Sequence, residues 1–367
     1  MIIKYIFVFI TLIHGLIHFM GFAKAFNYGN TTQLTKEITK PIGVVWFMTG
    51  LLFIICLVLY LLKKDSWVYF ALIPVVLSQI LIFNTWQDAK FGTIANVIIL
   101  LVTVIGFFQV KFKNEYRNEV KISLGDKQNL PNAMLTEAEI AYLPEAVKKY
   151  IRYVGCINKP IVHNFRIDFS GKIRDHAKPV WMPLVSEQYN FIKTPTRLFY
   201  LDATMKGLPV GGFHCFKNGV AFMDIRLLSI FKVAYQSGAV MDTSETVTFF
   251  NDMCVMAPAT LIDKRIEWLE VKENEVKAAF TNNGITISAW LYFNEKGELI
   301  DFVSHDRSAL AENGETIKLK WRTPVRDYKY INGYKLASYA ETIYSYPDGD
   351  FTYATFTLKD IGYNLTK

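Results

Sequence analysis

Four long runs of apolar residues fill the first 112 positions of this 367-residue chain. They extend from Ile2 to about Ala23, from Ile42 to Leu62, from Trp67 to about Trp86 and from Thr93 to Val110. A helix rises about 1.5 Å per residue and the hydrocarbon core of a bilayer is about 30 Å thick, so about 20 apolar residues cross it. The sequence therefore predicts an integral membrane protein whose residues 1–112 form an all-α bundle of four transmembrane helices.

The first run has an alternative interpretation as a cleaved signal peptide. Ala23-Lys24-Ala25 resembles a cleavage site flanked by small residues. The start of the chain carries only Lys4, however, and three further apolar runs follow. These two features favour a retained transmembrane helix, and cleavage stays the alternative.

Basic residues near the ends of the runs indicate an orientation in the membrane. If the N-terminus and the 63–66 turn lie inside, six basic residues flank the helices on that side and four on the other. The inner set is Lys4, Lys63, Lys64, Lys111, Lys113 and Arg117, and the outer set is Lys24, Lys36, Lys40 and Lys90. This difference favours a multi-pass protein of the cell membrane with a cytoplasmic soluble domain.

Charge and cysteine content exclude several classes of protein. Residues 1–112 have a net charge of +5, whereas the remaining 255 residues have a net charge of only +2. The sequence shows no basic cluster on one folded face, so no nucleic-acid partner is expected. The four cysteines show no C-x-x-C spacing and do not form a disulfide framework, which favours a reducing compartment.

The chain beyond residue 112 begins with a polar segment, 113–135, which we interpret as a linker. A soluble domain, 136–367, then starts with a predicted helical hairpin. Thr136 and Glu139 have the spacing of a capping box, and apolar residues recur at helical spacing over 147–154.

From about residue 160 the apolar period changes from 3.6 to 2, which indicates strands. Asn283-Gly284, placed between two alternating runs, is a hairpin signal, and the other connections are mostly short. One apolar helix, from about Ser244 to Pro258, interrupts the strands and must be buried. The expected fold is therefore an α+β domain in which a curved antiparallel β-sheet packs on a helix.

Polar residues inside the apolar runs are candidate site residues, because ionisable groups at membrane depth are costly. His14 and His18 lie four residues apart and so face one side of the first helix. At about 1.5 Å per residue, Gln79 and Asn96 fall in the same half of the bilayer, and Asp88 lies further out on that side. We predict that these five residues converge on a polar cluster or small cavity between the helices.

Several roles for this cluster remain open. Hydrogen bonding that holds the bundle together is the plainest, and contact with a lipid headgroup, a metal or a proton is the alternative. Haem is not expected, because two His on one helix cannot ligate both faces of a haem and the other runs contain no His. Zinc would find only Asp88 as a further ligand. No metal and no cofactor is therefore predicted.

The soluble domain offers four candidate site residues: His214, Asp252, His305 and Arg307. Asp252 follows Asn251 on the apolar helix, where a buried carboxylate near Arg226 or Arg265 would indicate a site. The domain contains no H-E-x-x-H, G-x-S-x-G, Walker or G-x-G-x-x-G motif, so a structural role for these residues is the main alternative.

The chain resembles a family of uncharacterised bacterial membrane proteins of unknown function over roughly residues 140–365. The matching features are Pro144-x5-Tyr150 with Gly155, Trp181-x5-Glu187-Gln188, the helix ending Met253–Pro258, Trp268, and the strand from Gly297 through Arg307 to Trp321. The resemblance implies no known activity, cofactor or catalytic residue. The strand pattern is also similar to the half-barrels of lipoprotein carriers, an analogy of fold that does not imply function.

Three classes of function follow from these observations. A membrane-tethered curved sheet rich in aromatic residues favours a protein that binds an apolar or lipid-like ligand, with membrane lipid as its partner. A membrane enzyme using Asp252, His214 or His305 is the second class and requires these side chains to lie within hydrogen-bond reach in a cleft. An envelope assembly or scaffold protein is the third.

Overall fold

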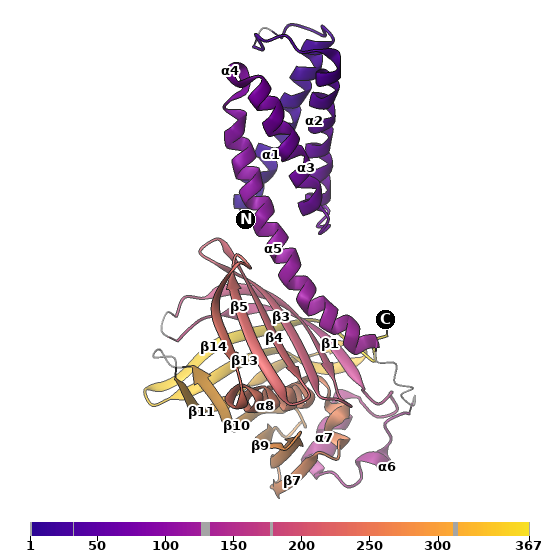
Figure 1. Cartoon of the computed structure of the whole chain (residues 1–367). Coiled ribbons are helices and arrows are strands. Elements are labelled where there is room, and N and C mark those ends of the chain that lie inside the picture. The colour runs from indigo at the N-terminus through magenta and orange to yellow at the C-terminus, as the bar shows by residue number, and fades with distance from the viewer. Residues whose placement is uncertain (1, 32, 126–132, 177–178, 311–314, 367) are drawn as a thin grey trace. The chain divides into compact units, whose positions relative to one another are not determined.

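The computed structural model describes residues 2–31, 33–125, 133–176, 179–310 and 315–366 (Figure 1). The chain folds into two compact units. The helical unit comprises residues 1–112 with 228–230, and the β-rich unit comprises 113–227 with 231–367.

The helical unit contains four helices that are long and apolar enough to cross a membrane. They are α1 (Ile2–Ala25), α2 (Lys40–Leu61), α3 (Trp67–Asn84) and α5 (Gly92–Gly125), and the short α4 (Trp86–Ala89) lies between the last two. The prediction of four such helices is confirmed. The bounds of α1, α2 and α3 differ from the predicted ones by one to two residues, whereas α5 continues to Gly125, well past the end of its apolar run at Val110.

Glycines allow α1 and α2 to approach closely. A Cβ atom added at Gly21 would lie 2.3 Å from the ring of Trp46, and one added at Gly43 would lie 2.3 Å from the Cβ of Ala25. Between membrane helices, where burial against lipid gains little, such close backbone packing is a main source of association.

The segment expected to be a linker begins as a helix. Residues 113–125 continue α5, and Tyr116 is fully buried with its ring 5.5 Å from the ring of Tyr200 and 5.7 Å from that of Phe213. Val120, one helical turn further, is buried as well. Two apolar residues at i, i+4 are enough to seat a helix on a sheet. Residues 126–132 lie outside the described residues.

Two short helices follow, α6 (Glu137–Ile140) and α7 (Glu145–Val154). The predicted capping box is present, since Thr136 and Glu139 each bond to the backbone of the other. Gly155 ends α7 in the left-handed conformation, with φ of 79°, which favours glycine. The buried face of α7 joins the main hydrophobic core.

Within the described residues, fourteen strands form one antiparallel sheet in the order β6-β5-β4-β3-β2-β1-β14-β13-β11-β10-β9-β8-β7, with β12 paired beside β13. The first six strands are β1 (Asn164–Ile173), β2 (Met182–Phe191), β3 (Thr196–Met205), β4 (Leu208–Lys217), β5 (Val220–Leu227) and β6 (Phe231–Ser237). The others are β7 (Ile266–Val271), β8 (Glu275–Asn282), β9 (Ile285–Phe293), β10 (Leu299–Leu310), β11 (Thr316–Arg322), β12 (Val325–Ile331), β13 (Tyr334–Tyr346) and β14 (Gly349–Tyr363).

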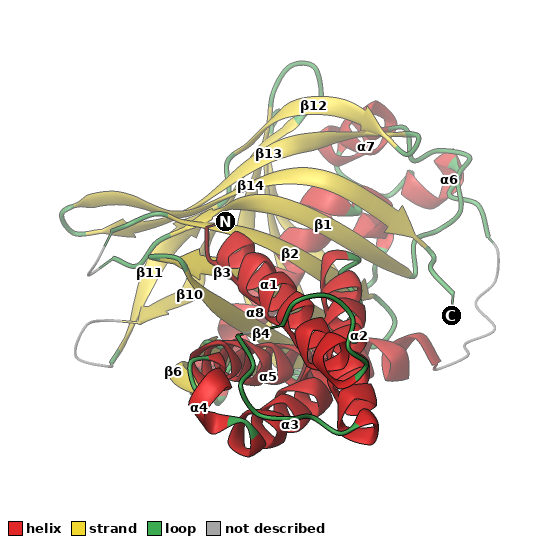
Figure 2. Ribbon diagram, turned by 90° about the horizontal axis from the view of Figure 1, so that it is seen from above, coloured by secondary structure: helices red, strands yellow, loops and turns green. Residues whose placement is uncertain are grey.

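The sheet curves around the helix that connects its two end strands (Figure 1). The two end strands, β6 and β7, are consecutive in the chain and are joined through α8 (Ala239–Met256) and the 3-10 helix η1 (Pro258–Ile262). This connection must cross from one end of the sheet to the other, and α8 lies within the curve of the sheet (Figures 1 and 2). Most of its residues are buried. The predicted fold, a curved antiparallel sheet packed on an apolar helix, is confirmed.

The sheet is covered on both faces along β3. Leu198 and Tyr200 are buried on the face that contacts Tyr116 of α5, whereas Arg197, Phe199 and Leu201 alternate with them and face α8. A strand covered on both faces has no exposed side, which explains the uninterrupted burial from Thr196 to Leu201.

Candidate ligand cavity

A polar stripe runs along one side of the otherwise apolar helix α8. Glu245, Thr248 and Asp252 form this stripe at helical spacing, and all three line a cavity of about 130 Å³ between α8 and the sheet. A cavity of roughly 10–15 Å³ is enough to hold one water molecule. This cavity therefore has room for a ligand much larger than one water molecule.

One side of the cavity is apolar. Its walls combine side chains from the β1, β2, β3 and β14 strands with the last turn of α8. These residues are Phe169, Ile173, Leu184, Phe199, Leu201, Val255, Met256 and Phe356. Aromatic and aliphatic walls beside a few convergent polar groups are typical of sites for small apolar or amphipathic molecules.

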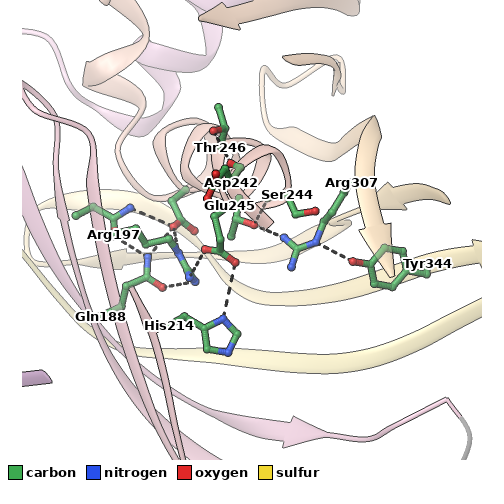
Figure 3. A network of polar contacts seen from close by, with 12 residues as sticks. Gln188, Arg197, His214, Asp242, Ser244, Glu245, Thr246, Arg307 and Tyr344 are labelled. Carbon is green, nitrogen blue, oxygen red and sulfur yellow. Dashed lines mark hydrogen bonds and ion pairs between the residues drawn. The ribbon is translucent and has the colours of Figure 1, made fainter. Parts of the chain in front are cut away.

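Arg197 organises the polar side of the cavity (Figure 3). Its Nε donates to Oδ2 of Asp252 at 2.8 Å, and its Nη1 donates to Oε2 of Glu245 at 3.1 Å. Its Nη2 donates to Oε1 of Gln188 at 3.0 Å. One planar guanidinium thus joins β3 to β2 and to two positions of α8 that lie about two turns apart.

Glu245 is 1% exposed, yet it is held as a carboxylate. Burial acts to raise its pKa, but the nearby Arg197, His214 and Arg307 outweigh that effect and lower the pKa to about 2. Nδ1 of His214 lies 3.7 Å from Oε1 of Glu245. Burial lowers the pKa of His214 and Glu245 only partly opposes the shift, so this imidazole is neutral at pH 7.

Asp252 has its two oxygens in different surroundings. Oδ2 accepts hydrogen bonds from Gln188 at 2.7 Å, from Asn190 at 3.1 Å and from Arg197 at 2.8 Å. No described residue donates to Oδ1. Burial raises the pKa of Asp252, although Arg197, Asn190 and Gln188 pull it down. The free Oδ1 is therefore the oxygen on which a proton would reside.

Arg307 approaches the cavity from β10, on the other side of α8. Its Nε donates to the hydroxyl of Tyr344 at 2.9 Å, its Nη1 donates to Oγ1 of Thr248, and its guanidinium lies 4.6 Å from the ring centre of Trp321. Burial acts to lower the pKa of Arg307, but the neighbouring Tyr344, Tyr353 and Glu245 outweigh that effect and raise the pKa, so the guanidinium stays charged. Among the described residues it forms no ion pair within 4 Å.

Three of the four predicted residues of the soluble domain, His214, Asp252 and Arg307, line this one cavity. His305 does not, because it is exposed on β10. The direct hydrogen bonds that an enzyme using these residues requires do not occur among the described residues, since Glu245 and Arg197 stand between His214 and Asp252.

The partners expected for Asp252 were wrong. Arg226 bonds to Asp224, and Arg265 bonds to Asp263, each two residues away on its own segment. The actual partner, Arg197, was missed together with Glu245 and Gln188. A signal was available for Arg197, which directly precedes the apolar run Leu198–Leu201, because a charge within a buried strand requires a partner.

The intramembrane polar residues also come together in part. Nε2 of His14 lies 2.8 Å from Oδ1 of Asn96, and Nδ2 of Asn96 donates to Oε1 of Gln79 at 3.1 Å. Ser78, which the sequence interpretation omitted, bonds to both His14 and Asn96.

His18 and Asp88 lie outside this hydrogen-bonded group. His18 is 1% exposed and bonds to the carbonyl of His14, and its Nε2 has no partner among the described residues. Asp88 instead accepts hydrogen bonds from Thr35 and Lys36 and so fixes the 26–39 loop. Among the described residues no group of three or more His, Cys, Asp or Glu is arranged to hold a metal ion.

Residues 133–356 match the model of a family described as "Family of unknown function (DUF6544)", and this match covers more than half of the chain. The chain belongs to this family, as its sequence features predicted. No curated protein matches the chain.

Three solved structures are similar to the chain, each with 9% sequence identity. A putative outer membrane lipoprotein-sorting protein domain from Vibrio parahaemolyticus matches 55% of this chain and 85% of its own, with a TM-score of 0.32. A LolA superfamily protein from Nitrosomonas europaea matches 60% and 93%, with a TM-score of 0.33. A DUF1329 family protein from Desulfovibrio piger matches 60% and 92%, with a TM-score of 0.35.

Proposed function

We propose that this member of the family is a multi-pass membrane protein whose β-rich unit binds an apolar or lipid-like ligand in the cavity between α8 and the sheet. The observation that carries the proposal is the cavity itself, about 130 Å³ in volume with an apolar wall of aromatic and aliphatic side chains. Membrane lipid is the proposed source of the ligand, because the same chain carries four helices that can cross a bilayer.

The arrangement of the core supports this proposal. α8 packs tightly at its other faces, where Phe249, Phe250 and Met253 are fully buried. Protein interiors are packed about as densely as organic crystals and hold few voids larger than a water molecule. A cavity that remains open beside such a core requires an explanation, and a bound apolar molecule provides one.

Two substitutions on β2 distinguish an effect inside the cavity from an effect on the surface. Leu184 lines the cavity from β2 and is buried, whereas the next residue, Val185, faces away and is exposed. Leu184→Trp places an indole in the space proposed for the ligand. Val185→Trp adds the same side chain outside it and is the matched control.

Lipid extraction and mass spectrometry of the full-length protein in nanodiscs test the proposal. We expect a lipid species that is enriched in the wild-type protein and in Val185→Trp but depleted in Leu184→Trp, because the nanodisc bilayer contributes equally to all three. Melting temperatures verify that both variants fold. Identical lipid profiles in all three proteins would contradict the proposal.

A further inference from the structure

The polar side of the cavity differs from a simple apolar pocket in its balance of charge. Arg197 faces both Glu245 and Asp252, so one guanidinium neutralises two carboxylates only in part. Arg307 supplies the second positive charge, but its hydrogen-bond partners are the neutral hydroxyls of Tyr344 and Thr248. The positive charge of Arg307 is therefore balanced by the carboxylates of Glu245 and Asp252, which it does not contact.

A guanidinium in this position has capacity for a further ligand. Arg307 has five N–H donors, and two of its nitrogens are engaged by Tyr344 and Thr248. The side chain lines the cavity, and Trp321 supports its planar face. Tyr344 and Thr248 leave one N–H on Nη1 and both N–H groups on Nη2 unused. Planar guanidinium groups bind carboxylate and phosphate oxygens through parallel hydrogen bonds from two such nitrogens, so this side chain favours an anion.

The other titratable groups around the cavity do not oppose an anion strongly. His214 lines the same space and can donate or accept a hydrogen bond. Asp252 is engaged through its Oδ2 by Arg197, Gln188 and Asn190, and burial raises the pKa of this carboxyl. Glu245 keeps its negative charge, but Arg197 and His214 contact its two oxygens.

Resting on the proposed function, we propose that the ligand is amphipathic and carries an anionic oxygen head, a carboxylate or a phosphate monoester, that binds Arg307. Its apolar tail then lies along the wall that includes Leu184, Leu201 and Phe356. The buried guanidinium and the apolar wall, which face one cavity, recognise the two parts of such a molecule. A neutral molecule of equal length would bind through its tail alone.

Three probes with the same alkyl chain test this assignment. Dodecanoate and dodecyl phosphate carry the two possible heads, and 1-dodecanol carries none with a charge. Equilibrium binding is measured on the full-length protein in phosphatidylcholine nanodiscs, with binding to empty nanodiscs subtracted. We expect at least one anionic probe to bind the wild-type protein at least tenfold more tightly than 1-dodecanol does, and the better of the two identifies the head.

Substitution of Arg307 gives the second part of the test. Arg307→Gln is expected to lose at least tenfold in affinity for the preferred anionic probe and to leave the affinity for 1-dodecanol unchanged. Arg326→Gln removes an exposed arginine that pairs with Glu341 on the neighbouring strand, and it serves as the control. Arg307→Lys keeps the charge without the planar fork and is expected to fall between the wild type and Arg307→Gln.

The possible failures are distinguishable. Equal affinities for the charged and uncharged probes, or equal losses for all probes in Arg307→Gln, would overturn the anionic head but leave an apolar ligand in place. If none of the three probes binds the wild-type protein, the proposed function fails as well. Retained binding of 1-dodecanol to Arg307→Gln shows that this variant is folded.

Discussion

At the scale of single residues, Arg197 determines how the polar side of the cavity is built. It is almost fully buried and contacts Glu245, Asp252 and Gln188 at 2.8 to 3.1 Å. Removing one member of a buried ion pair costs about 3–5 kcal/mol, because the remaining charge loses its partner. The network therefore fixes the position of α8 on the sheet in addition to shaping the cavity.

The pKa of Glu245 leads to a prediction about acid stability. A carboxylate whose pKa in the folded state lies near 2, below its ordinary value, stabilises the fold above the ordinary pKa. That stabilisation is lost as the pH falls toward 2. We expect the melting temperature of the wild-type protein to fall more steeply between pH 5 and pH 3 than that of Glu245→Gln.

Tryptophan fluorescence during heating measures both melting curves. Glu245→Gln is expected to melt at a lower temperature than the wild type at pH 7, because Arg197 loses a charged partner. Glu273→Gln, which changes an exposed carboxylate in the turn between β7 and β8, is the control and should follow the wild type. Parallel curves for the wild type and Glu245→Gln would show that Glu245 is not held as a carboxylate by the fold.

At the scale of secondary-structure elements, α5 has two different parts. Its first part is an apolar helix that can cross a membrane, and residues 113–125 pack on the sheet through Tyr116 and Val120. Lys217 also pairs with Glu119 at 3.3 Å. Tyr116 is the larger of the two buried apolar side chains of this second part.

Truncation of Tyr116 tests that role. Replacing a buried large aromatic side chain by alanine costs about 3–5 kcal/mol, so Tyr116→Ala should release residues 113–125 from the sheet. Hydrogen–deuterium exchange with mass spectrometry is expected to show faster exchange in this segment alone. Asn118→Ala, at an exposed position of the same helix, is the control. Unchanged exchange in Tyr116→Ala would indicate that other contacts hold the segment.

At the scale of the whole molecule, the proposed orientation places the β-rich unit in the cytoplasm and the 26–39 loop on the opposite side of the membrane. The four native cysteines are buried, so a cysteine introduced at an exposed position reports its own accessibility. Asn30→Cys in the loop and Glu273→Cys in the β-rich unit are suitable positions, since both residues are exposed.

A maleimide reagent that does not cross membranes then gives opposite results for the two variants. In right-side-out vesicles, Asn30→Cys is expected to react and Glu273→Cys to be protected, and inside-out vesicles should reverse this pattern. Labelling of both cysteines after detergent solubilisation shows that each is reactive. Reaction of Glu273→Cys in right-side-out vesicles would place the β-rich unit on the other side.

The sequence by itself determined the local features of this protein. Hydrophobic length predicted the four membrane helices, the change of period from 3.6 to 2 predicted the sheet, and the apolar composition of the 244–258 segment required a buried helix. Each of these signals lies within about 20 consecutive residues and depends on how apolar side chains repeat along a helix or strand. The contact among His14, Gln79 and Asn96 was predicted for a related reason. The position of a residue along a membrane-spanning helix determines its depth in the bilayer, and these three residues have similar depths.

Only the tertiary structure decided which polar residues share the cavity. Arg197 and Asp252, which form an ion pair, are 55 positions apart in the sequence. Arg307 and Thr248, which form a hydrogen bond, are 59 positions apart. Such pairs form because α8 crosses from one end of the sheet to the other and places one face against β3 and another against β10. The sequence contains no periodic signal for a contact between distant segments, so Asp252 was recognised as unusual while its partner was not.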